Sequence, residues 1–405
     1  MTVAAPGPGA APPAPARWSV YVHFPYCAKR CAYCDFATAA VREIPRERYT
    51  QAVLQELALR TATLRPAPID TVFFGGGTPS LWGAVHIGAV LHWLDGWGGI
   101  ARDAEVTLEA NPGVLEAGDL DGYAAAGINR VSVGIQALDA DRLRWLDRVH
   151  DVAAAHTTLA DLARLLANGR LHSASADLMF GVPGQTTADL ARDVAAVLGA
   201  GVPHLSAYAL TVEPGTPLHV KVERGLTARP DDDAQAEQLD ALPDLVAPWG
   251  LQRYEVSNFA RPGQEGRHNL AYWRGNFWLA VGMGAHGFVP GALHAMDLAG
   301  TRYGNVRDHT AWLDALAQGR LAEAMREDID LATHLTERVM TGLRLREGVD
   351  LEALAVRVGP AAVAALRGRV ALARARRVPI ELDGHTLRVA PDAMRMLDAV
   401  VRAVA

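Results

Sequence analysis

Cysteine is scarce in this chain of 405 residues, and its three copies, Cys27, Cys31 and Cys34, lie within one short segment. An odd number of cysteines excludes a closed disulfide framework, so a shared metal centre explains the cluster better. The chain also lacks a run of about eighteen apolar residues, which excludes a membrane-spanning helix of ordinary length. Its formal net charge of −6 gives no general attraction to nucleic acid or to an anionic membrane.

The N-terminal segment lacks both a basic start and a continuous apolar stretch, the two marks of a secretory signal peptide. It consists mostly of Ala, Pro and Gly, so we expect residues 1–17 to form a disordered tail. Because a cysteine cluster that must stay reduced suits the cytoplasm, the sequence predicts a cytoplasmic protein.

From Trp18 onward, short apolar runs alternate with amphipathic stretches, as in a parallel sheet with helical crossovers. The predicted strands cover residues 19–24, 71–74, 105–109, 130–135, 174–180 and 204–210, with one more at 252–259. The predicted helices cover residues 47–64, 84–93, 152–166, 187–198 and 231–245. Six strand–helix units indicate an α/β fold with a partial parallel (β/α)6 barrel, whose active site lies at the carboxyl ends of the strands.

A second domain is expected to begin near Asp330, so the chain divides into residues 1–17, 18–329 and 330–405. Helical patterns at 335–345, 351–358 and 361–375 precede a hairpin at 378–389 and a last helix at 391–403. Helices followed by a hairpin resemble a winged helix. A basic strip there would suit DNA, and it consists of Arg367, Arg369, Arg374, Arg376 and Arg377. Such strips are more often solvated helix faces, so we expect no nucleic-acid partner.

Glycine and polar residues gather where the predicted strands end. A glycine triplet and Thr78 follow the second strand, and glycines let a backbone approach a ligand closely. Later strands carry Glu109, Gln136 and Asp177 at or near their ends. One such residue alone is as often a loop cap, but several on one rim of a barrel indicate a binding site.

The three cysteines allow two kinds of metal centre. With Asp35 or His23 as a fourth ligand they could hold a structural zinc, whose sites are closed and four-coordinate. A cubane of four irons would take three thiolates and leave one iron open to another ligand. The spacing of three residues and then two, with an aromatic residue before the last cysteine, matches the cluster motif of the radical S-adenosylmethionine (SAM) enzymes. We therefore favour the cluster.

From Trp18 to the C-terminus, the chain resembles the oxygen-independent coproporphyrinogen-III-oxidase family within the radical SAM superfamily. The matching segments are Tyr21-Val-His-Phe-Pro-Tyr-Cys27, Phe74-Gly-Gly-Gly-Thr-Pro-Ser80, Glu109-Ala-Asn-Pro112, Val133-Gly-Ile-Gln136, Arg148-Val-His150, Asp177-Leu-Met-Phe-Gly-Val-Pro-Gly-Gln-Thr186 and Tyr208-Ala-Leu-Thr-Val-Glu-Pro-Gly-Thr216.

This resemblance implies a [4Fe–4S] cluster held by Cys27, Cys31 and Cys34, with its open iron facing SAM. It implies that the methionine end of SAM is lined by Tyr21, Gly76, Gly77 and Thr78. It also implies that the amino, carboxylate and ribose groups of SAM are contacted by Glu109, Gln136, Arg148 and Asp177. The chemical types agree, because arginine can fork onto a carboxylate and aspartate can accept from hydroxyl groups.

Two departures separate the chain from the oxidase branch of this family. The oxidases have a further cysteine two residues after the third, where this chain has Phe36, and a longer N-terminal segment that helps to enclose the porphyrinogen. The chain instead carries His268-Asn-Leu-Ala-Tyr272-Trp273, which resembles the motif of the haem chaperone branch, the HemW-type proteins. This resemblance implies His268 as an axial haem ligand beside two flat aromatic side chains. Without it, a histidine capping a loop above packed aromatic residues would be the simpler interpretation.

The sequence thus predicts a haem chaperone that binds haem, a [4Fe–4S] cluster and SAM, delivers haem to client haemoproteins, and does not oxidise coproporphyrinogen. One alternative is an oxygen-independent coproporphyrinogen III dehydrogenase that decarboxylates propionates oxidatively. The others are a radical SAM enzyme with another substrate and a nucleic-acid-binding module. A homodimer and peripheral membrane contact through the clients are compatible with this prediction.

Overall fold

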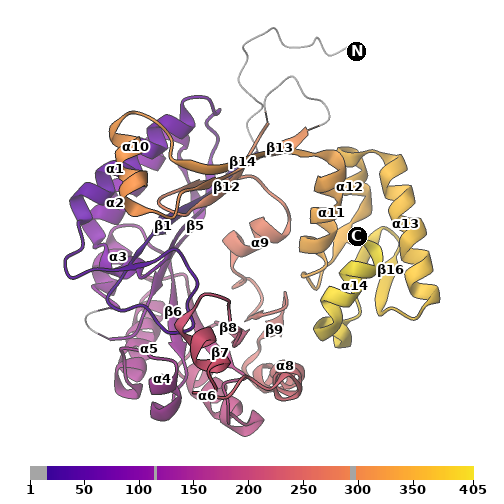
Figure 1. Ribbon diagram of the computed structural model, residues 1–405, viewed down its shortest axis with the longest axis horizontal. Coiled ribbons are helices and arrows are strands. Elements are labelled where there is room, and N and C mark those ends of the chain that lie inside the picture. The colour runs from indigo at the N-terminus through magenta and orange to yellow at the C-terminus, as the bar shows by residue number, and fades with distance from the viewer. Residues whose placement is uncertain (1–15, 114–115, 292–297) are drawn as a thin grey trace.

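The computed structural model describes residues 16–113, 116–291 and 298–405, so most of the expected tail lies outside the described residues. The strands form an arc with helices along its outer side, and a smaller, mainly helical unit stands beside the arc (Figure 1). Within the described ranges, no helix combines the length and the apolar character needed to cross a bilayer.

One twelve-stranded sheet organises the larger part of the chain, in the order β14-β13-β12-β11-β1-β4-β5-β6-β7-β8-β10-β9. Its parallel core consists of β1 (Trp18–Phe24), β4 (Ile69–Gly76), β5 (Ile100–Ala110), β6 (Arg130–Gln136), β7 (Ser173–Phe180) and β8 (His204–Ala209). These are the six strands predicted from the sequence. The α/β class with a partial parallel (β/α)6 barrel is confirmed.

The sheet continues on both sides of this core, where the sequence pattern predicted only one strand, at 252–259. Beyond β1 lie β11 (Trp278–Val281), β12 (His286–Val289), β13 (Leu298–Asn305) and β14 (Glu323–Asp330), of which only β11 runs parallel to its inner neighbour. On the other side, the strand expected at 252–259 is instead a hairpin of β9 (Gln252–Arg253) and β10 (Asn258–Ala260). The Glu255 carboxylate between them accepts from the Ser257 amide at 2.8 Å, which closes the turn.

The helices of the larger part are α1 (Arg46–Thr61), α2 (Ala84–Gly98), α3 (Leu120–Ala125), α4 (Ala140–Trp145), α5 (Val152–Ala167), α6 (Thr187–Gly199), α7 (Pro217–Glu223), α8 (Asp232–Val246), α9 (Arg267–Trp273) and α10 (His309–Ala317). The long ones begin where the sequence places them, and α5 and α6 start at capping side chains, Asp151 and Thr186. The short helices were not predicted, because helices of nine residues or fewer leave little periodicity to detect.

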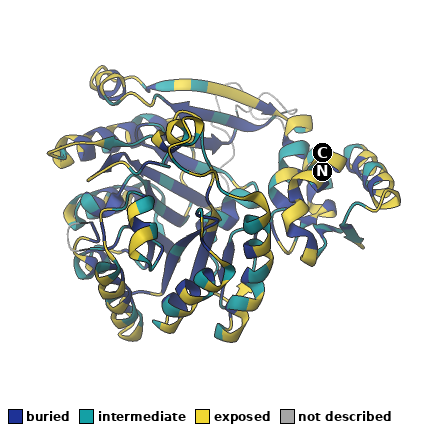
Figure 2. Ribbon diagram, turned by 60° about the horizontal axis from the view of Figure 1, so that its bottom comes forward, coloured by how far each residue is buried: buried dark blue, intermediate teal, exposed yellow. Residues whose placement is uncertain are grey.

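The two faces of the parallel strands differ in chemistry. Side chains toward the outer helices are apolar and fully buried, as Val20, Val72 and Val131 are. Figure 2 shows these buried strands inside a layer of helices whose outer faces are exposed. Alternate residues point to the concave face of the arc, and there buried polar groups such as Glu105 and His204 are common. Helix α9 lies within the arc on this polar face (Figure 1).

The C-terminal unit has a hydrophobic core of its own, in which Val339, Leu366 and Val400 are fully buried. Its elements are α11 (Leu331–Gly342), β15 (Val349–Asp350), α12 (Leu351–Val358), α13 (Pro360–Ala375), β16 (Ile380–Asp383), β17 (Thr386–Val389), the 3₁₀ turn η3 (Pro391–Met396) and α14 (Leu397–Val404). The predicted hairpin is present, and the last helix begins later than expected because η3 precedes it.

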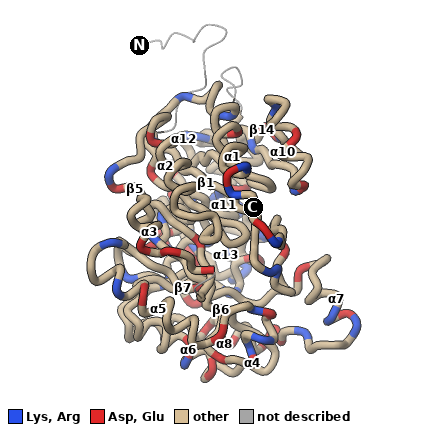
Figure 3. Tube along the Cα trace, turned by 90° about the vertical axis from the view of Figure 1, so that its left-hand side faces the viewer, with Lys and Arg blue, Asp and Glu red and all other residues tan. Residues whose placement is uncertain are grey.

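Charges of both signs are interspersed along the chain trace in Figure 3. In the C-terminal arginine strip, two side chains bond within their own unit. Arg367 donates to the Gly384 carbonyl at 3.2 Å and Arg369 to the Val404 carbonyl at 2.8 Å. These two arginines therefore help to hold the elements of the C-terminal unit together.

Candidate functional site

A cavity of about 300 Å³ opens at the carboxyl ends of the parallel strands. Most of the predicted site residues line it, namely Cys27, Cys31, Cys34, Gly76, Gly77, Thr78, Glu109, Gln136, Arg148 and Asp177. Tyr21 and His268, the two remaining predictions, lie elsewhere in the structure. The tertiary fold thus brings strand ends far apart in sequence to one place beside the cysteine loop.

The glycine segment at the end of β4 is tightly packed against the chain between His23 and Tyr26. Gly76 has a φ of +116°, and a Cβ added there would lie 2.6 Å from the His23 ring. A Cβ at Gly77 would lie 2.6 Å from the Tyr26 carbonyl oxygen. The Gly77 and Thr78 amides donate to the carbonyls of Phe24 and Tyr26, at 2.7 and 2.8 Å. The glycines therefore let the end of β4 pack against the chain that leads to Cys27.

The cysteines are free thiols, and Cys27 is 8% exposed. Burial raises the pKa of Cys27 to about 11, so binding of a metal must displace the thiol proton. Among the described residues, no three His, Cys, Asp or Glu side chains converge closely enough for one metal ion. A cluster differs, because each thiolate binds a separate iron.

His23, one fourth ligand considered for zinc, is engaged elsewhere. Its Nδ1 lies 2.9 Å from the Tyr21 hydroxyl, and its Nε2 lies 2.9 Å from the Ala37 carbonyl oxygen. Burial lowers the pKa of His23 to about 4, so the ring is neutral. Among the described residues, His23 is thus not free to join the three thiols, so this donor set fits an iron–sulfur cluster with one open iron better than a closed zinc site completed by His23.

Arg148 bridges the cysteine loop and the strand ends. One terminal nitrogen donates to Cys31 Sγ and to the Tyr33 hydroxyl, both at 3.4 Å. The other donates to the Gly134 carbonyl at 3.0 Å and to the Asn111 amide oxygen. Its Nε is buried without a partner within the described part of the chain. Burial alone would lower the pKa of Arg148, but Tyr33 and Cys31 raise it overall, so the group stays a cation suited to an anionic ligand.

Two carboxylates face the same cavity. Glu109 accepts from the Gly76 amide at 3.0 Å, and burial, with the nearby charge of Asp177, raises the pKa of Glu109 to about 8. Asp177 accepts from the Ser132 hydroxyl at 3.1 Å, and burial raises the pKa of Asp177 as well. A bound cation or a pair of hydroxyl donors would favour the charged forms of both groups.

Gly134 makes room for the side chains that meet at the centre of this rim. A Cβ at Gly134 would lie 2.9 Å from both the Asn111 amide oxygen and Gln136 Nε2. Gln136 itself has a φ of 65°, which is uncommon outside glycine. Asn111 also donates to the Thr78 hydroxyl at 3.2 Å, so it joins the glycine segment to Arg148. The sequence analysis did not select Asn111, although an amide just after the end of a strand was a usable signal.

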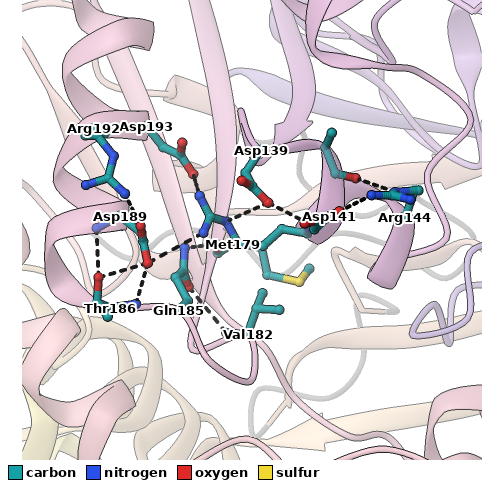
Figure 4. A network of polar contacts seen from close by, with 12 residues as sticks. Asp139, Asp141, Arg144, Met179, Val182, Gln185, Thr186, Asp189, Arg192 and Asp193 are labelled. Carbon is teal, nitrogen blue, oxygen red and sulfur yellow. Dashed lines mark hydrogen bonds and ion pairs between the residues drawn. The ribbon is translucent and has the colours of Figure 1, made fainter.

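Helix α4 sets the position of Arg148. The Arg148 amide donates to the Leu143 carbonyl of α4 at 3.0 Å. The Arg142 guanidinium on the same helix lies 3.6 Å from the Asp189 carboxylate and 3.7 Å from the Asp193 carboxylate, both on α6. Figure 4 shows these two aspartates within a network of polar contacts. The Asp147 carboxylate, just before Arg148, pairs with Lys29 of the cysteine loop. Ion pairs thus fix the helix and the loop on either side of the arginine.

His268 lies on the concave face of the sheet, nearer the amino ends of the strands, and is 1% exposed. Its Nδ1 lies 2.7 Å from the Thr71 hydroxyl, its Nε2 lies 2.7 Å from the Tyr272 hydroxyl, and burial lowers its pKa to about 3. The ring stacks on Phe73 with 5.1 Å between centroids. Because both ring nitrogens are occupied, this arrangement does not fit a haem iron at His268.

Tyr21 does not line the cavity but packs against residues of the β4 end that leads to it. It stacks on Phe73, with 6.2 Å between centroids, and a Cβ at Gly75 would lie 3.0 Å from its ring. Tyr21 therefore supports the glycine segment from below. The predicted contact between Tyr21 and SAM stays a prediction.

Comparison with known proteins places this architecture in a family. Residues 21–197 match the profile of the radical SAM superfamily, and residues 329–396 match that of the HemN C-terminal domain. The haem chaperone HemW of Mycobacterium tuberculosis is 39% identical over 350 residues, which cover 86% of each chain. The chain belongs to the HemW family. This is the HemW-type branch of the oxygen-independent coproporphyrinogen-III-oxidase-like radical SAM proteins.

Other relatives of this HemW-family chain agree. The mitochondrial radical S-adenosyl methionine domain-containing protein 1 of Danio rerio is 37% identical and covers 82% of this chain and 73% of its own. The solved structure of HemN, the coproporphyrinogen III oxidase of Escherichia coli, superposes with a TM-score of 0.80 over 96% of this chain and 90% of its own. At 19% identity this second likeness shows the fold alone.

Proposed function

We propose that this HemW-family protein is a haem chaperone, which binds haem and passes it to client haemoproteins. The observation that carries the proposal is the 39% identity to the haem chaperone of M. tuberculosis over 86% of both chains. Phe36 supports it, because its 60% exposed side chain lines the cysteine cavity at the position where the oxidase branch carries a further cysteine.

The proposal assigns a [4Fe–4S] cluster and SAM to the cysteine cavity. Cys27, Cys31 and Cys34 would hold the cluster, which supplies electron-transfer chemistry to SAM when it is bound. The binding surface for SAM would be formed by Gly76, Gly77, Thr78, Glu109, Gln136, Arg148 and Asp177. Arg148 is the candidate for the carboxylate of SAM, since its guanidinium is buried and charged. Glu109 and Asp177 are the candidates for its amino and ribose groups.

Haem binding through His268 requires a rearrangement of α9. The hydrogen bonds of His268 to Thr71 and Tyr272 would have to break. The contacts of the Glu105 carboxylate with the Arg267 and His268 amides, each 3.0 Å, also hold α9 in place. We therefore propose His268 as an iron ligand only in a state in which α9 has left the concave face.

We further propose that the protein acts in the cytoplasm, where cysteines stay reduced, and that its domains divide near Asp330 into residues 18–329 and 330–405. The separate core of the C-terminal unit supports this division. A homodimer and peripheral membrane contact through the clients stay predictions from the sequence.

Anaerobic cluster reconstitution, followed by haem titration and transfer to an apo-haemoprotein, tests the proposed function. We expect saturable haem binding with a shifted Soret band, and recovery of the client's own spectrum after mixing. In a parallel incubation with SAM and a reductant, the mass of coproporphyrinogen should not change. Decarboxylated product would establish the oxidase instead, and haem that binds but never reaches a client would exclude a chaperone.

A further inference from the structure

A second cavity, of about 320 Å³, lies at the amino ends of β5, β6 and β7, at the opposite end of these strands from the cysteines. Its walls come from the start of β5, from the residues that open β6 and β7, and from the loop that enters α9. We call it the Arg130 cavity. It shares no lining residue with the cysteine cavity.

Arg130 is a buried cation that lies near one carboxylate, on Glu105, without a hydrogen bond to it. The residue is 4% exposed, and its Nε has no hydrogen bond among the described residues. The nearest carboxylate oxygen, on Glu105, lies 3.8 Å from this nitrogen, which is too long for a hydrogen bond. Because a buried charge is costly unless it is both paired and hydrogen-bonded, this guanidinium, which Glu105 pairs with only at a distance, can take a further acceptor.

Two further polar groups around the cavity lack partners. Ser173 is the direct neighbour of Arg130 in the pairing of β6 with β7, and its hydroxyl is buried and unpaired within the described ranges. The side-chain oxygen of Gln264, across the cavity, is also unpaired there. An amide can present its nitrogen in place of its oxygen. Because buried polar groups are generally satisfied, the three together indicate a ligand that accepts hydrogen bonds.

The charges around the cavity limit the size of that ligand. Arg102 and Arg267 add to the positive side, and Asp103, Glu105 and Glu265 to the negative side. The Glu105 carboxylate is already used, since it accepts from the first two amides of α9. A cavity with balanced charges and one underused guanidinium suits a single anionic group rather than a polyanion.

We propose that the Arg130 cavity binds one oxyanion group, a carboxylate or a phosphate, through Arg130 and Ser173. Such a ligand would influence α9, because the Glu105 carboxylate lies between Arg130 and the helix that carries His268. A free small anion or a propionate of haem could supply the group. The second source rests on the proposed function, and the first does not.

Calorimetry on the cluster-loaded protein distinguishes these sources. Succinate, inorganic phosphate, haem and haem dimethyl ester are titrated into the wild type, Arg130→Gln and Ser173→Ala. Arg229→Gln is the control, since Arg229 is exposed and pairs with Glu223 outside the cavity. We expect affinity to fall about tenfold or more in Arg130→Gln, less in Ser173→Ala, and not at all in the control, as for loss of a charge-assisted hydrogen bond.

A fall for succinate or phosphate identifies a free anion as the ligand. A fall for haem, with no change for its ester, identifies a propionate. Unchanged affinities for all four ligands in both variants would overturn the proposal. If Arg130→Gln does not fold, Ser173→Ala decides by the same comparison. If haem fails to bind the wild type, the proposed function fails, while the succinate and phosphate titrations still test the cavity.

Discussion

The cysteine motif and the His268 motif both place polar side chains in the interior of the arc, but only the first leaves them facing a cavity. At the carboxyl ends of the strands, the cysteines, Glu109 and Arg148 surround a cavity, and their charges and thiols are available to a ligand. On the concave face, His268 of α9 is enclosed, and its neighbours Thr71 and Tyr272 satisfy both of its ring nitrogens. A motif residue can thus either line a binding site or be part of the packed interior, depending on which residues surround its side chain in the folded structure.

This difference in accessibility arises from the backbone structure around each motif. The cysteines stand on a loop, where side chains at the rim of the strands cannot all be paired by the protein. His268 stands in the first turn of a helix that lies against the sheet, where its two ring nitrogens are both paired, as buried polar groups generally are. The first region is therefore expected to respond to mutation through ligand binding, and the second through stability.

The largest effect is expected at the cysteine end. Cys31→Ala should lose the cluster, so that reconstituted protein falls from about four irons per chain to nearly none, because a thiolate ligand is removed. Iron and sulfide analysis measures this directly. Phe36→Ala is the matched control, because this exposed neighbour holds no iron and should leave the iron content unchanged. Stoichiometric zinc in anaerobically purified protein would contradict the cluster.

A large effect on stability is expected at α9. His268→Asn should lower the free energy of unfolding by about 2–4 kcal/mol, because a buried ring is removed and two hydroxyls lose a partner. Tyr272→Phe, which removes only one of these bonds, should cost about 1 kcal/mol. Urea unfolding of the cluster-free protein measures both changes. A neutral result for His268→Asn would mean that the histidine is not held as the structure shows.

The stability that His268 contributes is expected to depend on pH. Burial lowers the pKa of His268 from 6.5 to about 3, so the unfolded chain takes up a proton before the folded chain does. The stabilisation by neutral His268 is therefore complete above pH 6.5 and is lost as the pH falls toward 3. The difference in stability between the wild type and His268→Asn should shrink from pH 7.5 to pH 5. A gap independent of pH would show that the ring is not buried in its neutral form.

A smaller effect is expected where a ligand contact is lost without loss of the fold. Arg148→Gln should weaken SAM binding by about tenfold or more, because a buried cation for its carboxylate is removed, while the iron content stays normal. Arg142→Gln should weaken it less, since Arg142 only anchors the helix that leads to Arg148. Calorimetry on cluster-loaded protein gives the order. Equal affinity in Arg148→Gln and wild type would remove Arg148 from the SAM site.

The smallest effect is expected at the exposed ion pair beside the cavity. Lys29 and Asp147 are both substantially exposed, and such pairs contribute about 0.2–1 kcal/mol. Lys29→Met should therefore change SAM affinity by less than about fivefold, and high salt should bring the wild type to the same value. A much larger loss would show that Lys29 contacts the ligand itself.

Much of the fold could be predicted from local patterns. The six parallel strands follow from apolar runs separated by amphipathic segments, and α12 has the bounds that its periodicity indicates. The outer strand β14 could not be predicted, because it is mostly exposed and carries charged residues such as Glu327 and Asp328. Its strand conformation depends on pairing with β13 rather than on an apolar pattern.

By itself, the sequence determined the candidate cluster ligands, because three cysteines on one short loop are neighbours whatever surrounds them. It also determined which strand ends carry polar groups, since parallel strands share one rim. Only the tertiary structure decided that His268 contacts Thr71, a residue 197 positions away. It also decided that Arg130 lies beside Ser173, with no hydrogen bond to its Nε among the described residues. Pairing of buried polar groups depends on which segments pack together, and no local pattern encodes that.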